Sequence, residues 1–180
     1  MTKQQKSKPK LRNGTPDKHG YKQCVSELLA DNTVQMMKRF RHHHSVTCYD
    51  HCLNVSVYSF LICKALGLDY KSAARGGLLH DLFLYDWRTT ELSDGKHAFR
   101  HPEIALTNAE IIFELNKVER DIIKKHMWPL TLKFPVYKES LVVCFVDKYC
   151  AAAEIIRSSA LGLSIKVSRL IFNLKNFSLF

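Results

Sequence analysis

An apolar run in the middle of the chain ends in two adjacent polar side chains, His80 and Asp81. Residues 73–79 contribute two alanines, two glycines and two leucines, and residues 82–84 return at once to Leu-Phe-Leu. An imidazole and a carboxylate in that much hydrocarbon cost several kcal/mol unless something pairs with them. For a single His-Asp pair, a helix end with a hydrogen-bonded histidine is the better explanation. A functional interpretation therefore needs support from the rest of the chain.

Length and cysteine usage indicate one ordinary domain. The chain has 180 residues and a mean hydropathy of −0.17, which suits a single buried core. No apolar run reaches the length of a membrane span, and the basic N-terminus is not followed by the apolar segment of a secretory signal. The six cysteines form no Cys-x-x-Cys pair and are expected to be reduced, buried thiols. We therefore expect a cytoplasmic protein with no membrane partner.

The net charge of +10 is concentrated at the N-terminus. Residues 1–22 are rich in lysine and contain one acidic residue, Asp17. Such a composition predicts a disordered basic tail, followed by a single domain at residues 23–180. A solubilising role for the tail is favoured over weak attraction to nucleic acid, so nucleic acid is not expected as a partner.

The spacing of apolar residues predicts an all-α fold, a compact bundle of about six to eight helices. The helix near residues 138–157 is apolar nearly all round, so it is expected to be central. Residues 86–100 form a long polar loop, which in a compact domain is usually functional. The other expected helices cover residues 25–37, 49–66, 72–79, 102–115, 118–126 and 161–180.

Five separate segments each present a metal-competent side chain where a polar residue needs a reason. They are His51, His80-Asp81, His101, His126 and Asp147. Imidazole and carboxylate donors without thiolate favour iron, manganese, cobalt, nickel or zinc, with magnesium a further candidate. Each has an alternative explanation: His101 as a helix cap, His126 as a surface residue, Asp147 as the partner of Lys148 or an arginine. We expect a shared metal site rather than all of these separate explanations being true together.

In their order along the chain, these residues resemble the HD superfamily of metal-dependent phosphohydrolases. The resemblance covers roughly residues 40–155. It rests on Asp-His-Cys-Leu-Asn-Val at 50–55, Arg-Gly-Gly-Leu-Leu-His-Asp at 75–81, His-Pro-Glu-Ile-Ala at 101–105, Ile-Ile-Lys-Lys-His at 122–126 and Phe-Val-Asp-Lys at 145–148.

The resemblance implies a helical bundle around a site for two divalent metal ions. His51, His80, Asp81 and Asp147 would hold one ion, with Asp81 bridging to a second held by His101 and His126. His80 and Asp81 would be the catalytic residues. The implied reaction is the hydrolysis of a phosphomonoester or phosphodiester, by attack of a metal-activated water on a small, nucleotide-like substrate.

The sequence departs from the wider family around the substrate. Many members carry a lysine three residues after the aspartate, where this chain has Leu84. The cation for a phosphate must then come from elsewhere, and residues 80–88 resemble the variant of a small stand-alone bacterial subgroup. A Gly-Tyr-Pro signature of cyclic-di-GMP phosphodiesterases is absent between the last two histidines, which argues against that substrate. Candidate substrate contacts are Arg88, Lys96, His97, Lys148 and, from the His-His-His run at 42–44, His44.

Two other functions stay open. The same ligand pattern resembles that of di-iron oxygenases such as myo-inositol oxygenase. A binding or regulatory module without turnover is the other alternative, although a degenerate site usually loses a ligand and this one is complete. The sequence specifies no oligomeric state.

Overall fold

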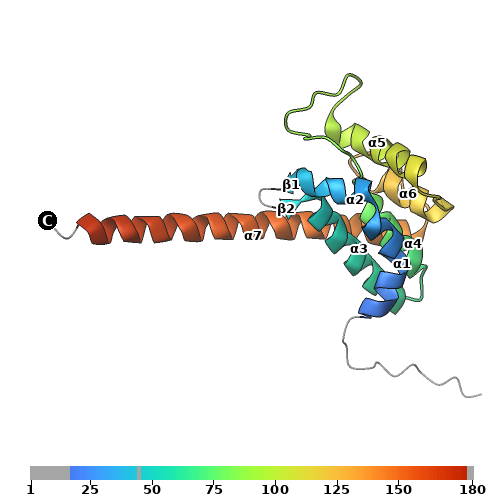
Figure 1. Ribbon diagram of the computed structural model, residues 1–180, viewed down its shortest axis with the longest axis horizontal. Helices are drawn as coiled ribbons and strands as arrows, with labels where there is room; N and C mark the ends of the chain where they lie inside the picture. Colours follow the sequence, from blue (N-terminus) through green and yellow to red (C-terminus); the bar gives the residue numbers. More distant parts are fainter. Residues whose placement is uncertain (1–16, 44–45, 178–180) are drawn as a thin grey trace, which may run out of the picture.

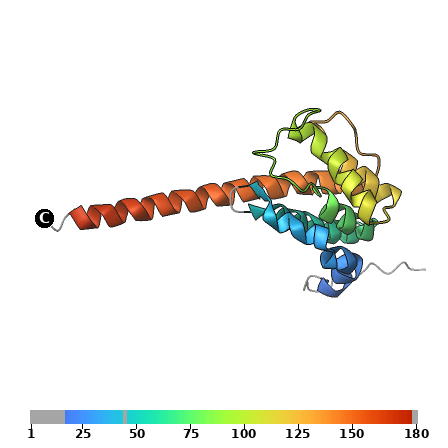
Figure 2. The ribbon, with the colours of Figure 1, turned by 45° about the horizontal axis from the view of Figure 1, so that its top comes forward.

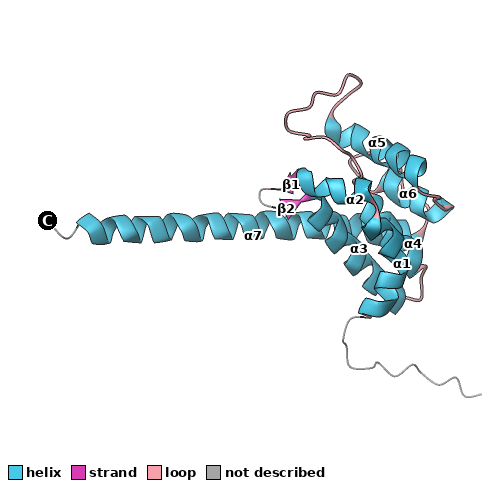
Figure 3. Cartoon of the chain, in the orientation of Figure 1, coloured by secondary structure: helices cyan, strands magenta, loops and turns pink. Residues whose placement is uncertain are grey.

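Helices make up nearly all regular structure in the described part of the chain (Figure 3). The computed structural model describes residues 17–43 and 46–177; for residue 43 and residues 160–177 it describes only the backbone. Those ranges contain seven α-helices, one short 3-10 helix and a two-stranded sheet. The predicted all-α class and number of helices are confirmed.

The expected first helix is interrupted at Asp31. It divides into α1 (Lys18–Ala30), α2 (Asn32–Met36) and the 3-10 turn η1 (Met37–Arg39). Asp31 causes the break because its backbone is extended and its carboxylate accepts a hydrogen bond from the Thr33 amide at 2.7 Å. An aspartate in this position caps the next helix.

The folded part begins earlier than residue 23. Asp17 caps α1 by accepting a hydrogen bond from the Gly20 amide at 2.9 Å. Residues 18–22 are therefore helical, although their lysines predict a tail. Residues 1–16 lie outside the described part, so their expected disorder stays a prediction.

A small hairpin precedes the third helix. Strands β1 (Arg41–His43) and β2 (Val46–Thr47) pair antiparallel. Strands this short show too little alternation to be found from sequence. The Thr47 hydroxyl then caps α3 (Cys48–Ala65) by accepting a hydrogen bond from the Asp50 amide at 3.1 Å. The hairpin thus ends directly at the start of the helix that carries His51.

Helix α4 (Tyr70–Leu79) lies at the centre of the bundle (Figure 1). It contacts α1, α3 (Cys48–Ala65), α5 (His97–Ile112), α6 (Lys117–Lys125) and α7 (Lys138–Phe177). The sequence predicts the helix at 138–157 as the central one instead. The helix that ends in His80-Asp81 is therefore the one that most of the others surround.

Two glycines let the neighbouring helices approach α4. A Cβ atom on Gly77 would lie 3.1 Å from the Ser56 Cα, and one on Gly76 would lie 2.8 Å from the Ile122 side chain. Because the Ser56 contact involves backbone, α3 would have to move to accommodate even an alanine. The short spacing also lets the Ser56 hydroxyl donate a hydrogen bond to the Ala74 carbonyl at 2.6 Å.

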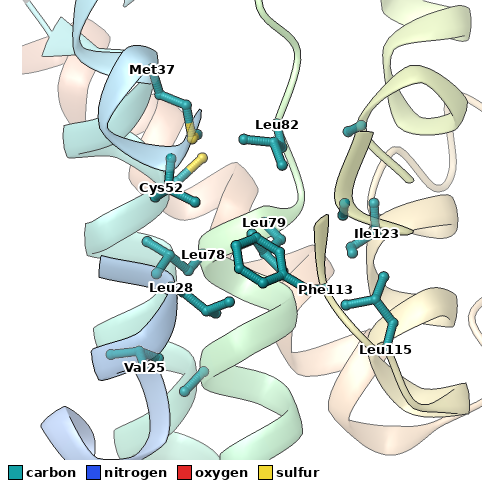
Figure 4. Packing of buried hydrophobic residues seen from close by; sticks show 14 of the residues in the cluster. Val25, Leu28, Met37, Cys52, Leu78, Leu79, Leu82, Phe113, Leu115 and Ile123 are labelled. Carbon is teal, nitrogen blue, oxygen red and sulfur yellow. The ribbon is translucent and has the colours of Figure 1, made fainter. Parts of the chain in front are cut away.

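The main core fills the space between α4 and the helices around it (Figure 4). It draws residues from α1, α3, α4, α5 and α6, and burying each large aliphatic side chain contributes roughly 1.5–3 kcal/mol. Labelled members are Val25, Leu28, Met37, Cys52, Leu78, Leu79, Leu82, Phe113, Leu115 and Ile123. This packing holds the end of α4 rigid.

Helix α7 differs from expectation in length and burial. The sequence predicts two helices separated near residue 160, but α7 continues to Phe177, and its C-terminal half extends away from the bundle (Figure 2). Its first turns bury Val143 and Cys144, whereas Phe145 and Tyr149 are 59% and 66% exposed. Up to residue 159, the helix is therefore buried along one face only. Within the described residues, no helix combines the length and hydropathy that a membrane span requires.

Candidate metal centre

All six predicted ligands come together in one buried cluster. His51 lies in the first turn of α3, His80 and Asp81 follow α4, and Asp147 lies on α7. His101 and His126 come from α5 and the end of α6. All six side chains are buried, Asp147 being the most exposed at 8%. Residues up to 96 positions apart in the sequence thus share one site.

His101 lies inside its helix and not at its mouth. α5 begins at His97, which the sequence assigns to the polar loop. Pro102 is therefore in the second turn of the helix, where a missing backbone amide removes an intrahelical hydrogen bond. Because His101 lies four residues after His97 in the helix, its Nδ1 can donate to the His97 carbonyl, at 2.9 Å.

Asp81 is the centre of the cluster and uses its two oxygens on different sides. Its Oδ1 lies 3.2 Å from the Nε2 of His101 and 3.4 Å from the Nε2 of His126. Its Oδ2 lies 3.2 Å from the Nε2 of His42 and 3.6 Å from the Nε2 of His80. One carboxylate therefore joins two groups of imidazoles.

Asp147 and Glu154 enclose His51 from α7. The Asp147 Oδ1 lies 3.0 Å from the His51 Nε2 and 3.6 Å from the His80 Nε2. On the other side of the ring, the Glu154 Oε2 lies 3.1 Å from the His51 Nδ1. A carboxylate on the second nitrogen fixes the tautomer and orientation of a ligating imidazole.

Three histidines are held in the same tautomer by backbone carbonyls. A carbonyl only accepts hydrogen bonds, so the Nδ1 that contacts it carries the proton, and in a neutral ring the Nε2 keeps a lone pair. The donor–acceptor pairs are His80 to Gly77 at 2.9 Å, His101 to His97 at 2.9 Å and His126 to Ile123 at 2.8 Å. All three lone pairs are thereby directed at Asp81.

This arrangement of acceptors fits a cation. The Nε2 atoms of His101 and His126 lie 2.8 Å apart, although each is the lone-pair nitrogen of its ring. The His80 Nε2 and the Asp81 Oδ1 are buried and have no hydrogen-bond partner among the described residues. Converging lone pairs of this kind repel each other unless a cation or a proton lies between them. Imidazole nitrogens with carboxylate oxygens are the donors of transition-metal sites.

The electrostatics without an ion show how strongly these groups are coupled. Burial opposes ionisation of His51 and His80, yet hydrogen bonds to Asp147 and Glu154 raise the pKa of the His51 imidazole well above its usual value, and the nearby Asp81 carboxylate does the same for the pKa of His80. Burial also opposes ionisation of Asp81 and Asp147, yet the surrounding histidines hold the pKa of both carboxyls well below the usual range. Buried charges of this kind persist only when they are paired.

Two residues of the cluster are absent from the predicted ligand set. Glu154 follows Asp147 by seven residues, so both lie on one face of α7; it is the only acid in the apolar stretch at 151–156, and this spacing was a usable signal. His42 belongs to a run of three histidines, and its place in strand β1 brings its ring to the site. His44, the predicted substrate contact, lies outside the described residues.

A cavity of about 610 Å³ opens above the cluster. Its polar part is formed by cluster residues, including Asp81 and Asp147. Its wall is largely apolar and is formed by Trp87, Ala98, Met127, Pro129, Leu130 and Ala151. Lys148 is the only lysine or arginine among the described residues that line it.

Two of the predicted substrate contacts lie in this cavity. The Lys148 ammonium donates to the His126 carbonyl at 2.8 Å and lies 3.9 Å from the Asp147 Oδ2. The His97 ring is stacked between Trp87 and His101, with centroid distances of 5.5 and 4.6 Å. Burial, followed by the neighbouring His101, lowers the pKa of His97 to about 4. His97 is therefore a neutral ring at physiological pH.

The structure does not bring Arg88 or Lys96 to the cavity wall. The Arg88 guanidinium donates to the carbonyls of Arg41 and His42 at 3.0 and 2.9 Å and lies over the Trp87 ring. It fixes the hairpin instead of presenting a charge to the cavity. Lys96 occupies the N-cap position of α5.

The fold and the cluster together define a helical protein with a buried histidine–aspartate site. A family model described as HD domain matches residues 48–152, which is more than half of the chain. The chain belongs to the HD domain family, whose members bind divalent metals and include metal-dependent phosphohydrolases. The search of curated proteins and the search of solved structures each found no match.

Proposed function

We propose that the protein is a metal-dependent phosphohydrolase with a two-ion site. The observation that carries this proposal is the convergence of lone pairs on Asp81, above all the His101 and His126 Nε2 atoms 2.8 Å apart. Protons can bind these lone pairs only if a charged imidazolium stays buried, whereas divalent cations can bind the imidazole nitrogens and the carboxylate oxygens together.

The possible ligands form overlapping groups around His80 and Asp81, which we divide between two ions. His51, His80 and Asp147 offer ligand atoms within 4.8 Å of one another, and so do His80, Asp81 and His126. We assign the first ion to His51, His80, Asp81 and Asp147, and the second to His101 and His126, with Asp81 shared. Divalent ions at such a site supply Lewis acidity and an activated water to a phosphoester.

The chain's own residues would bind and orient the substrate. Lys148, at the cavity wall beside Asp147, would bind phosphoryl oxygens. The rings of Trp87 and His97, which line the cavity, would contact a planar organic group such as a nucleobase. The apolar wall formed by Met127, Pro129 and Leu130 would exclude bulk water, which strengthens electrostatic interactions inside the site. For these reasons we propose a small phosphorylated, nucleotide-like substrate. We also propose a cytoplasmic location, which the free thiols favour.

The experiment is hydrolysis of generic phosphoesters by the purified protein after loading with Mn²⁺, Fe²⁺, Co²⁺, Ni²⁺, Zn²⁺ or Mg²⁺. The panel contains p-nitrophenyl phosphate, bis(p-nitrophenyl) phosphate and the nucleoside monophosphates. Metal-dependent release of phosphate or p-nitrophenol that disappears in Asp81→Asn supports the proposal. A fully loaded protein that releases nothing from the whole panel contradicts it.

One observation favours an alternative function. Because Lys148 is the only lysine or arginine among the described lining residues and the rest of the wall is mostly apolar, the cavity also suits an uncharged substrate. That property fits an oxygenase of the same fold with two iron ions. Oxygen uptake by the iron-loaded protein in the presence of small polyols, without phosphate release from the ester panel, would select this alternative.

A further inference from the structure

The β1–β2 hairpin directs one more imidazole at the metal centre. The His42 Nε2 lies 3.2 Å from the Asp81 Oδ2, closer than the 3.6 Å of the His80 Nε2 to the same atom. His42, His51 and Asp81 form a group whose potential ligand atoms all lie within 4.8 Å of one another. His42 also lines the cavity, so its ring lies between the buried site and the open space.

His42 repeats the orientation of His51. The two rings are stacked, with a centroid distance of 3.9 Å and an angle of 15° between planes. Glu154 lies beside both Nδ1 atoms, at 3.1 Å from that of His51 and 3.9 Å from that of His42. Both Nε2 atoms face carboxylates, Asp147 for His51 and Asp81 for His42. An Nδ1 hydrogen-bonded to a carboxylate and an Nε2 turned inward are the typical arrangement of a metal-ligating histidine, which His51 has and which His42 approaches.

The hairpin holds this ring in place by backbone hydrogen bonds on both sides. Arg88 donates to the carbonyl of His42 itself at 2.9 Å and to that of Arg41 at 3.0 Å. The Cys48 amide donates to the Phe40 carbonyl at 2.8 Å, which ties the start of the hairpin to the start of α3. The position of His42 is thus fixed from two separate segments, as the first coordination shell of a metal requires.

We propose that His42 is a further ligand of the metal centre, binding through its Nε2 on the Oδ2 side of Asp81. The ion is a divalent transition metal that accepts several imidazole nitrogens, such as iron, cobalt or zinc. The inference rests on the proposed metal centre and is independent of the reaction that the centre performs.

The direct test identifies the coordinating nitrogens in the intact protein. Chain labelled with ¹⁵N-histidine is loaded with ¹¹³Cd²⁺, a stand-in for zinc whose nuclear spin splits the signal of every nitrogen bound to it. The proposal expects cadmium coupling at the Nε2 of His42 in addition to His51, His80, His101 and His126. Cadmium coupling at the last four without His42 overturns the inference and leaves the metal centre intact. A protein that binds no cadmium overturns the metal centre as well.

The affinity test uses two histidine variants. His42→Ala is compared with His19→Ala, which removes an exposed histidine of α1, and Zn²⁺ affinity is measured by competition with a chromophoric chelator. Loss of a ligand is expected to weaken binding by more than the roughly 10–100-fold that loss of an outer-shell partner costs, while His19→Ala binds as the parent does. An affinity unchanged in His42→Ala, with the helical circular dichroism of the parent, overturns the proposal. If His42→Ala does not fold, the cadmium experiment on the parent chain still decides.

Discussion

His101 and His126 face each other through Nε2 atoms 2.8 Å apart, although 25 residues separate them in the chain. Each ring donates its Nδ1 proton to the backbone of its own helix, to the carbonyls of His97 and Ile123. Two helices thus fix the tautomer of both rings before any ligand arrives. A pair of opposed lone pairs beside the Asp81 carboxylate is unfavourable in itself and becomes favourable when a cation lies among them.

Removing either of these rings is expected to abolish binding of the second ion and to leave the first ion bound. In our assignment, His101→Ala or His126→Ala leaves the ligands of the first ion intact, so about one tightly bound ion should remain and hydrolysis should fall by orders of magnitude. Metal content and p-nitrophenyl phosphate hydrolysis are measured on the same preparations, with His19→Ala as the control. Hydrolysis at the parental rate in both variants would mean that the reaction needs only one ion.

Asp147 and Asp86 should respond very differently to alanine. Asp147 pairs with the buried rings of His51 and His80, and removing one partner of a buried charge pair costs about 3–5 kcal/mol. Asp86 lies in the loop, where its carboxylate accepts a hydrogen bond from the Arg88 amide at 3.0 Å. We expect Asp147→Ala to lose metal and stability and Asp86→Ala to lose little of either. Elemental analysis and urea unfolding measure both, and full metal occupancy in Asp147→Ala would remove this residue from the site.

Gly77→Ala tests whether close packing of α3 on α4 positions the site. The new Cβ would lie 3.1 Å from the Ser56 Cα, and overpacking of this kind costs about 1–3 kcal/mol, against a gain of about 1 kcal/mol in helix propensity. The substitution should therefore lower the free energy of unfolding, and it should also weaken metal binding because the Gly77 carbonyl holds the His80 ring. Lys71→Ala, at an exposed position of the same helix, is the control. A stabilised Gly77→Ala variant with parental metal affinity would contradict this account.

The N-terminal boundary can be located by truncation. A chain that starts at residue 16 keeps Asp17, which caps α1 and pairs with Lys64, so its melting midpoint should match the full chain. A chain that starts at Tyr21 loses that cap and the first turn, so its melting midpoint should be lower. Thermal unfolding followed by circular dichroism compares the two. Equal midpoints would show that the first turn of α1 contributes nothing to stability.

The sequence predicts the parts of this molecule that local chemistry determines. Apolar periodicity predicts the helices, and a polar side chain in an apolar segment marks each of His51, His80, Asp81 and Asp147, because burying such a group needs a reason wherever the helix packs. The structure brings these residues together, while their binding of metal stays a prediction.

What the sequence does not predict depends on contacts between distant segments. The sequence alone does not place His42 at the site, since its position there depends on a three-residue strand. Arg88 has the charge of a phosphate contact, but two carbonyls of that hairpin bind its guanidinium. Apolar composition likewise predicts a central α7, whereas the Phe145 side of the helix is exposed, because burial depends on which helices pack against it.

The metal content of the native chain tests the central claim most directly. The protein is purified without chelator, loaded with Mn²⁺, Fe²⁺ or Zn²⁺ in turn, freed of unbound ions by gel filtration and analysed for metal per chain. Shared coordination by Asp81 predicts about two ions per chain, and about one after His101→Ala. A chain that leaves the column without bound metal under every loading condition would contradict the account, because the converging lone pairs around Asp81 would then be satisfied by protons alone.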